Sequence, residues 1–203
     1  IFYILKFIAF SYSAALDPEN GFWLSFLGYT LGVGLCEEFV KSIPLLYYRD
    51  SESGSRWRGL MIAGLASGAG FGIAEGIMYS SEYYNGVDSG QIYLVRFLSC
   101  VALHAIWTGS VAISIHERRD SFAGLGGVRD WIVPWLMVIA VPATLHGLYD
   151  TCLKKDSNGY ALLVAFASFG YLAFVLSRRQ ADDDTLAQKN LLRDYVRRRQ
   201  PAT

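Results

Sequence analysis

Long apolar segments alternate with short charged clusters along this chain. The apolar segments cover residues 1–16, 21–48, 58–80, 91–115, 131–151 and 159–177. Most of them reach the ~20 residues that an α-helix needs to cross about 30 Å of hydrocarbon. They are apolar on all sides and lack the alternation of barrel strands, which argues against a soluble domain and against closed strands. The pattern therefore predicts an all-α, polytopic transmembrane helical bundle with about six spans.

Basic residues are distributed unevenly among the loops. Segments 49–58 and 116–130 and the C-terminal tail each carry several arginines, whereas 17–20 and 81–90 carry no basic residue and 152–158 carries two lysines. Basic loops remain on the cytoplasmic side of a membrane. We therefore expect a multi-pass protein of the cell membrane with both ends inside, N-in and C-in.

The two ends of the chain carry separate predictions. The chain begins at Ile1 and not at Met, so we expect a processed or trimmed product with a truncated first span. Charged residues dominate from Arg178 onward, where an acidic cluster precedes a basic stretch. We expect residues 1–177 to form one membrane domain and 178–203 to form a cytoplasmic polar and basic tail, which lies in the cytosol or on the anionic inner leaflet.

Composition adds two exclusions to this picture. Of the 203 residues, 53% are hydrophobic, and 18 basic side chains balance 18 acidic ones. The net charge is therefore zero and gives no overall attraction to nucleic acid as a partner. The lipid bilayer is the expected environment. The cysteines at 36, 100 and 152 show no C-x-x-C spacing, so we expect neither a disulfide framework nor a thiolate metal site.

Seven ionisable side chains on four of the apolar segments are candidates for function. They are Glu37, Glu38 and Lys41 in the second segment, Glu75 in the third, His104 in the fourth, and His146 and Asp150 in the fifth. Such groups are costly in hydrocarbon unless they face protein or water, which makes each a functional candidate. Helical spacing places Glu37 with Lys41, and His146 with Asp150, on shared faces. Glycines spaced by four before Glu75 predict close helix packing beside it.

Two imidazoles and a carboxylate suit a metal-assisted hydrolase. A catalytic zinc ion keeps three protein ligands and one open position, and His104, His146 and Glu75 would supply these ligands from three helices. A metal-free route is also open. In that route a Glu–His pair activates water and the second His stabilises the oxyanion.

The remaining polar residues fit supporting roles at the same site. Glu37 or Glu38 would act as general base and then as general acid, and Lys41 would keep one of them ionised. Asp150 would orient His146 as an outer partner or complete the metal coordination.

Other functions use the same residue types. A single intramembrane histidine is commonly a structural hydrogen bond between helices, but the whole set in four helices argues against a purely structural role. A proton-coupled transporter with a Glu–His relay is the main alternative, although the sequence shows no internal repeat. A scaffold or bis-histidine haem protein would leave the glutamates unexplained.

The polar motifs occur in a fixed order on successive segments. They are Glu37-Glu38-x-x-Lys41, Phe71-x-x-x-Glu75, His104 and His146-x-x-x-Asp150. This order resembles the PrsW family of intramembrane proteases, which are distantly similar to the CAAX prenyl-protein proteases. In those more distant relatives the motifs are EExxxR and FxxxH. Here Lys41 lies one position earlier and Glu75 replaces the histidine, as in the PrsW variant.

The resemblance, which covers about residues 37–150, implies an activity and a set of roles. It implies a membrane endopeptidase, classed as a metallopeptidase, that processes membrane-anchored protein substrates, with anti-sigma-factor cleavage as the type activity. Catalytic duties then fall on Glu37, Glu38, Glu75, His104, His146 and Asp150. Zinc is the expected cofactor.

The depth of these residues predicts the side of access. With ~1.5 Å of rise per residue, Glu37 and His104 lie roughly 16 Å from the cytoplasmic ends of their spans. Glu75 and His146 lie at roughly 22–24 Å by the same count. In a core about 30 Å thick, the site then reaches from the midplane into the outer leaflet. We expect scissile bonds to be reached from the extracytoplasmic side.

Overall fold

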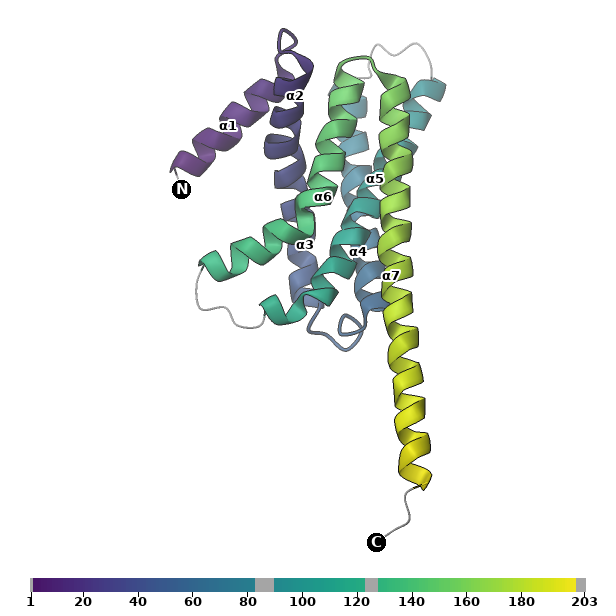
Figure 1. Cartoon of the computed structure of the whole chain (residues 1–203). Coiled ribbons are helices and arrows are strands. Elements are labelled where there is room, and N and C mark those ends of the chain that lie inside the picture. The colour runs from purple at the N-terminus through teal and green to yellow at the C-terminus, as the bar shows by residue number, and fades with distance from the viewer. Residues whose placement is uncertain (1, 83–89, 123–127, 200–203) are drawn as a thin grey trace.

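The structure, a computed structural model, describes residues 2–82, 90–122 and 128–199 (Figure 1). Its helices are α1 (Phe2–Leu16), α2 (Phe22–Gly28), the π-helix η1 (Tyr29–Gly34), α3 (Leu35–Tyr48), α4 (Trp57–Glu82), α5 (Gly90–Glu117), the 3₁₀-helix η2 (Arg119–Phe122), α6 (Val128–Lys154) and α7 (Asn158–Arg199). No strand occurs within these ranges, so the all-α prediction is confirmed.

Within the described residues, four helices are long and apolar enough to cross a membrane. They contain the spans Trp57–Met78, Phe97–Glu117, Asp130–Lys154 and Asn158–Arg193. Helix α1 is shorter, at 15 residues, and the second apolar segment is divided into α2, η1 and α3. The count of six spans and the N-in, C-in orientation stay predictions. Part of the loops used to orient the chain, 83–89 and 123–127, lies outside the described residues.

Helix α4 packs closely on α5 because it presents a row of glycines. A Cβ atom added at Gly64, Gly68 or Gly72 would collide with α5 atoms. At Gly68 the colliding atom is the carbonyl oxygen of His104. The glycines thus have the packing role that their spacing predicts. They bring Glu75, three residues beyond the last of them, to the same interface.

The second apolar segment contains one π-helical stretch, Tyr29–Gly34. A π-turn is wider than an α-turn, so it changes the direction in which the following side chains point. Glu37 and Glu38 follow directly. The stretch packs between α1 and α6, and Gly34 lies against the backbone of Ala143 in α6.

Helices α6 and α7 depart from the predicted segments. Pro134 and Pro142 lie inside α6, and Figure 1 shows its first turns directed away from the bundle. A proline removes one backbone donor and bends a helix, which accounts for this shape. Helix α7 continues to Arg199, well beyond residue 177, because no glycine or proline interrupts 178–199. Residues 178–199 of the tail are therefore a helical extension of α7.

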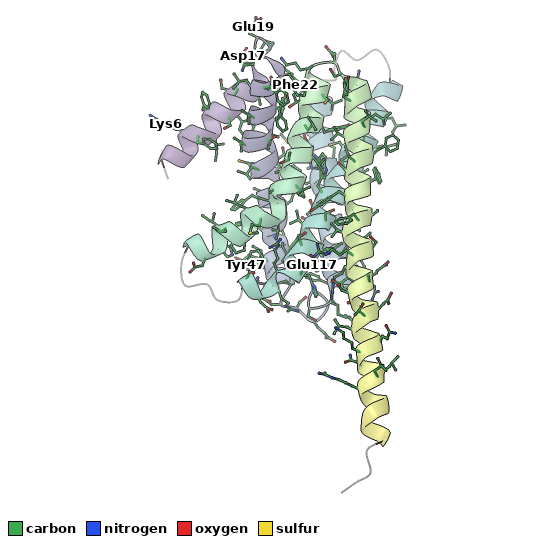
Figure 2. The ribbon with its side chains drawn as sticks, in the orientation of Figure 1. Lys6, Asp17, Glu19, Phe22, Tyr47 and Glu117 are labelled. Carbon is green, nitrogen blue, oxygen red and sulfur yellow. The ribbon has the colours of Figure 1, made fainter. Side chains whose placement is uncertain are left out.

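The two ends of the bundle carry different loops. Asp17 and Glu19 lie at one end, while Tyr47 and Glu117 lie at the other (Figure 2). Between these ends, buried apolar residues such as Leu60 and Ile139 form the core between α3, α4, α5 and α6. Large apolar side chains on α7 point outward, as expected for a surface that faces lipid.

The glycine row gives a first prediction with a matched control on the same helix. Gly68→Ala places a methyl group against the α5 backbone at His104, whereas a Cβ at Gly70 meets no atom within 4 Å. Overpacking typically costs about 1–3 kcal/mol. We expect Gly68→Ala to lower the thermal unfolding temperature of the detergent-solubilised protein and Gly70→Ala to leave it unchanged. Equal behaviour of the two variants would contradict the packing account.

Candidate active site

Four helices bring all the predicted polar residues into one cluster. Helix α3 supplies Glu37, Glu38 and Lys41, α4 supplies Glu75, α5 supplies His104, and α6 supplies His146 and Asp150. Each of these side chains has a polar atom within 4 Å of another member of the set. The convergence that the motifs suggested is therefore present in the fold.

The ammonium group of Lys41 lies at the centre of the cluster. Its Nζ atom is 2.6 Å from Glu38 Oε1, 2.6 Å from His104 Nδ1 and 3.8 Å from Glu37 Oε2. The Phe71 ring centroid lies 4.8 Å from the same Nζ, at cation–π distance. Because an ammonium group can only donate, Nδ1 of His104 accepts from it. The proton of a neutral His104 ring is then on Nε2.

The other nitrogen of His104 faces α4. Its Nε2 atom lies 2.6 Å from Glu75 Oε2, so the ring donates to this carboxylate. The Sγ atom of Cys100 lies 3.5 Å from the same Glu75 oxygen. His104 is buried, while the Glu75 side chain is 17% exposed. This pair therefore links the buried cluster to a more accessible carboxylate.

His146 lies between three carboxylates and is 2% exposed. Its Nδ1 atom is 3.2 Å from Glu38 Oε1, and its Nε2 atom is 3.3 Å from Asp150 Oδ2 and 3.7 Å from Glu37 Oε2. Glu38 thus contacts both Lys41 and His146 through a single oxygen. The two ring nitrogens of His146 face opposite sides of the cluster.

Two residues near the histidines were not assigned to the site from the sequence. Trp107 stacks on the His146 ring, with centroids 4.5 Å apart and an interplanar angle of 18°, and its Nε1 donates to Ser168 Oγ of α7 at 3.0 Å. Trp107 is three residues after His104, so helical spacing already placed both on one face. Cys100 lies one turn before His104 and contacts Glu75.

A cavity of about 70 Å³ opens beside the two imidazoles. Its lining includes Glu75, Ser99, Cys100, Leu103, His104, Trp107, His146, Tyr149, Asp150 and Leu153. This volume holds a few water molecules. From the histidines the lining continues along α5 and α6 toward Ser99 and Leu153, away from the loop 49–56. The site therefore has room for water next to polar groups.

Two groups of side chains could hold a metal ion. The donor atoms of Glu37, His104 and His146 lie within 4.8 Å of one another, and so do those of Glu75, Cys100 and His104. Two nitrogens and one oxygen make a donor set that zinc accepts. Within the described residues, the buried Oε2 atom of Glu37 has no hydrogen-bond partner, which leaves it available to a cation. The residues therefore fit a zinc ion, which on His104 would replace the proton that Nε2 donates to Glu75.

This grouping differs from the ligand set expected from the sequence. That set combined Glu75 with both histidines, whereas the first group combines Glu37 with them. Glu75 shares only His104, in the group that also contains Cys100. The ligand role of Glu75 stays a prediction, and Glu37 competes with it.

The chain was compared with protein families, with curated proteins and with solved structures. The model of the PrsW family intramembrane metalloproteases matches residues 2–177, which is most of the chain. No match was found among curated proteins or among solved structures. The family match and the four long apolar helices identify an integral multi-pass membrane protein with endopeptidase activity. The chain belongs to the PrsW family of intramembrane metalloproteases.

Proposed function

We propose that this protease hydrolyses peptide bonds of membrane-anchored regulatory proteins of the anti-sigma-factor type, assisted by zinc. The observation that carries the mechanism is the set of donor atoms from Glu37, His104 and His146 within 4.8 Å of one another. Zinc bound there supplies Lewis acidity, which polarises the scissile carbonyl and makes water a nucleophile at neutral pH. The side chains of the protein orient the reactants and move the protons.

The geometry favours an exchange of the two roles that the sequence assigned to Glu37 and Glu75. Glu37 groups with both imidazoles but does not line the cavity. Glu75 lines the cavity, where a substrate and water would lie, and already contacts His104. We therefore assign Glu37 to the metal and Glu75 to the transfer of a proton from water to the leaving amine.

Glu38 and Lys41 act as positioning residues in this proposal. Glu38 is fully buried, and its Oε1 contacts both Lys41 Nζ and His146 Nδ1. A carboxylate behind one nitrogen of a histidine fixes the ring so that the other nitrogen faces the metal. Lys41 supplies the counter-charge that a buried carboxylate requires. Neither side chain lines the cavity, so neither is placed against substrate.

Asp150 belongs to the metal-facing side of His146. Its Oδ2 atom lies 3.3 Å from Nε2, the nitrogen opposite to the one that contacts Glu38. Asp150 also lines the cavity. It therefore lies on the metal-facing side of the ring and not behind it, and the three ligands named above leave the fourth coordination position to water.

Single substitutions separate the ligand from the base. In purified, reconstituted protein with a single-span reporter substrate, Glu37→Gln should lose both bound zinc and cleavage. Glu75→Gln should retain zinc and cleave roughly 10²–10⁴-fold more slowly, the contribution typical of a general base. Elemental analysis measures the zinc bound per chain, and the reporter measures cleavage. The control variant His146→Ala should lose both the zinc and the cleavage. Thermal unfolding checks that each variant is folded.

Two results would contradict this proposal at different levels. If Glu75→Gln lost zinc and Glu37→Gln kept it, the roles assigned from the sequence would be restored. If both variants and His146→Ala cleaved the reporter at the wild-type rate, the protease mechanism at this cluster would be rejected.

The cavity supports access from the extracytoplasmic side. Its lining extends from the histidines to Leu153, near the end of the bundle whose loops lack arginine. Figure 2 shows Tyr47 at the opposite end, and this side chain is 83% exposed. Leu153 and Tyr47 therefore lie toward opposite ends of the bundle.

Cysteine labelling tests the side of access. In a background with the three native cysteines replaced by alanine, Leu153→Cys should react in intact cells with a membrane-impermeant maleimide. Tyr47→Cys should react only in inverted vesicles. Reaction of Leu153→Cys exclusively in inverted vesicles would reverse the orientation.

A further inference from the structure

A second and larger cavity lies at the end of the bundle opposite the active-site opening. Its volume is about 700 Å³, and it lies between the loop that precedes α4, the first turn of α4, the end of α5 and the middle of α7. It shares no lining residue with the cavity beside the histidines. The catalytic cluster therefore does not account for it.

A buried tryptophan and one carboxylate form contacts that stabilise the wall of this cavity. Trp57 is 5% exposed, and its Nε1 donates to Asp183 Oδ2 at 2.6 Å. The other oxygen of Asp183 lies 3.0 Å from Arg179 Nη2. Of the residues that the structure describes, Asp183 is the only carboxylate that lines the cavity, and both of its oxygens are already engaged. These contacts join α4 to α7.

Three guanidinium groups face this single carboxylate. Arg56, Arg58 and Arg179 all line the cavity. Among the described residues, no carboxylate lies within ion-pair distance of Arg56 or Arg58, and Arg58 lies 4.6 Å from the Trp57 ring centroid. The Nε atom of Arg179 is buried without a hydrogen-bond partner in the described part of the chain. The cavity therefore offers donors and excess positive charge to an anion.

The chemistry and the position of the cavity indicate a phosphate group as its ligand. Arginine binds phosphate oxygens through paired, charge-assisted hydrogen bonds. The cavity is at the arginine-rich end of the bundle, where lipid headgroups of the inner leaflet are expected. Ile62, which is 62% exposed, also lines it and provides an apolar surface for the start of an acyl chain. A headgroup and its chain would fit these two parts of the wall.

We propose that this cavity binds the phosphate group of an anionic phospholipid and thereby fixes the loop between α3 and α4 against α7. Helices α3 and α4 carry Glu37 and Glu75, so lipid bound at this loop stabilises two of the four helices that supply the candidate active site. This proposal stands apart from the proteolytic mechanism, because none of its residues belongs to the catalytic cluster.

Lipid binding to purified protein tests the proposal. The double variant Arg56→Gln/Arg58→Gln removes two cavity arginines, whereas Arg118→Gln removes an exposed arginine at the same end that does not line the cavity. In native mass spectrometry, wild type and Arg118→Gln should retain one phosphatidylglycerol in preference to phosphatidylcholine. The double variant should bind it at least tenfold more weakly. Added phosphatidylglycerol should raise the thermal unfolding temperature of the first two proteins only.

Three outcomes would count against the proposal. Equal phosphatidylglycerol binding by the double variant and wild type would reject the site. An equal loss in Arg118→Gln would show only diffuse attraction to surface charge. If inorganic phosphate alone stabilised the protein as much as phosphatidylglycerol does, the lipid would be rejected as the source of the phosphate group.

Discussion

The buried ammonium of Lys41 is the interaction on which the active site depends. It lies 2.6 Å from both Glu38 and His104, and these two side chains contact His146 on α6 and Glu75 on α4. One polar network thus joins four helices inside an apolar bundle. Removing one partner from a buried pair typically costs about 3–5 kcal/mol, because an uncompensated charge remains. The same contacts that tie the helices together therefore hold the two imidazoles in place.

The sequence predicted the class of fold and a set of polar residues that lie together in it, because both inferences rest on the free-energy cost of polar groups in hydrocarbon. Apolar segments long enough to span a bilayer predicted the helices. The ionisable residues within them, from Glu37 to Asp150, were identified as candidates because an ionisable group in hydrocarbon costs free energy unless it faces protein or water. The glycines before Glu75 also indicated where α4 and α5 approach each other, and Gly68 lies against the α5 backbone. These inferences need only composition and helical spacing.

The division of roles depends on the rotation of each helix, which spacing along one helix does not define. A π-helical stretch directly precedes α3, and in the fold Glu37, not Glu75, groups with both histidines. Trp107 was not predicted at the site, because its stacking on His146 depends on how α6 packs against α5. The arginine-lined cavity likewise joins Arg56 to Arg179, two residues far apart in sequence. Contacts between helices determine all three features.

X-ray absorption spectroscopy at the zinc edge tests the central claim most directly, because it reports the ligand atoms of the wild-type protein. Zinc held by Glu37, His104 and His146 predicts only nitrogen and oxygen neighbours at about 2.0–2.2 Å, with the scattering pattern of two imidazoles. A sulfur neighbour at about 2.3 Å would instead indicate the group that contains Cys100. That result would contradict zinc binding by Glu37, His104 and His146.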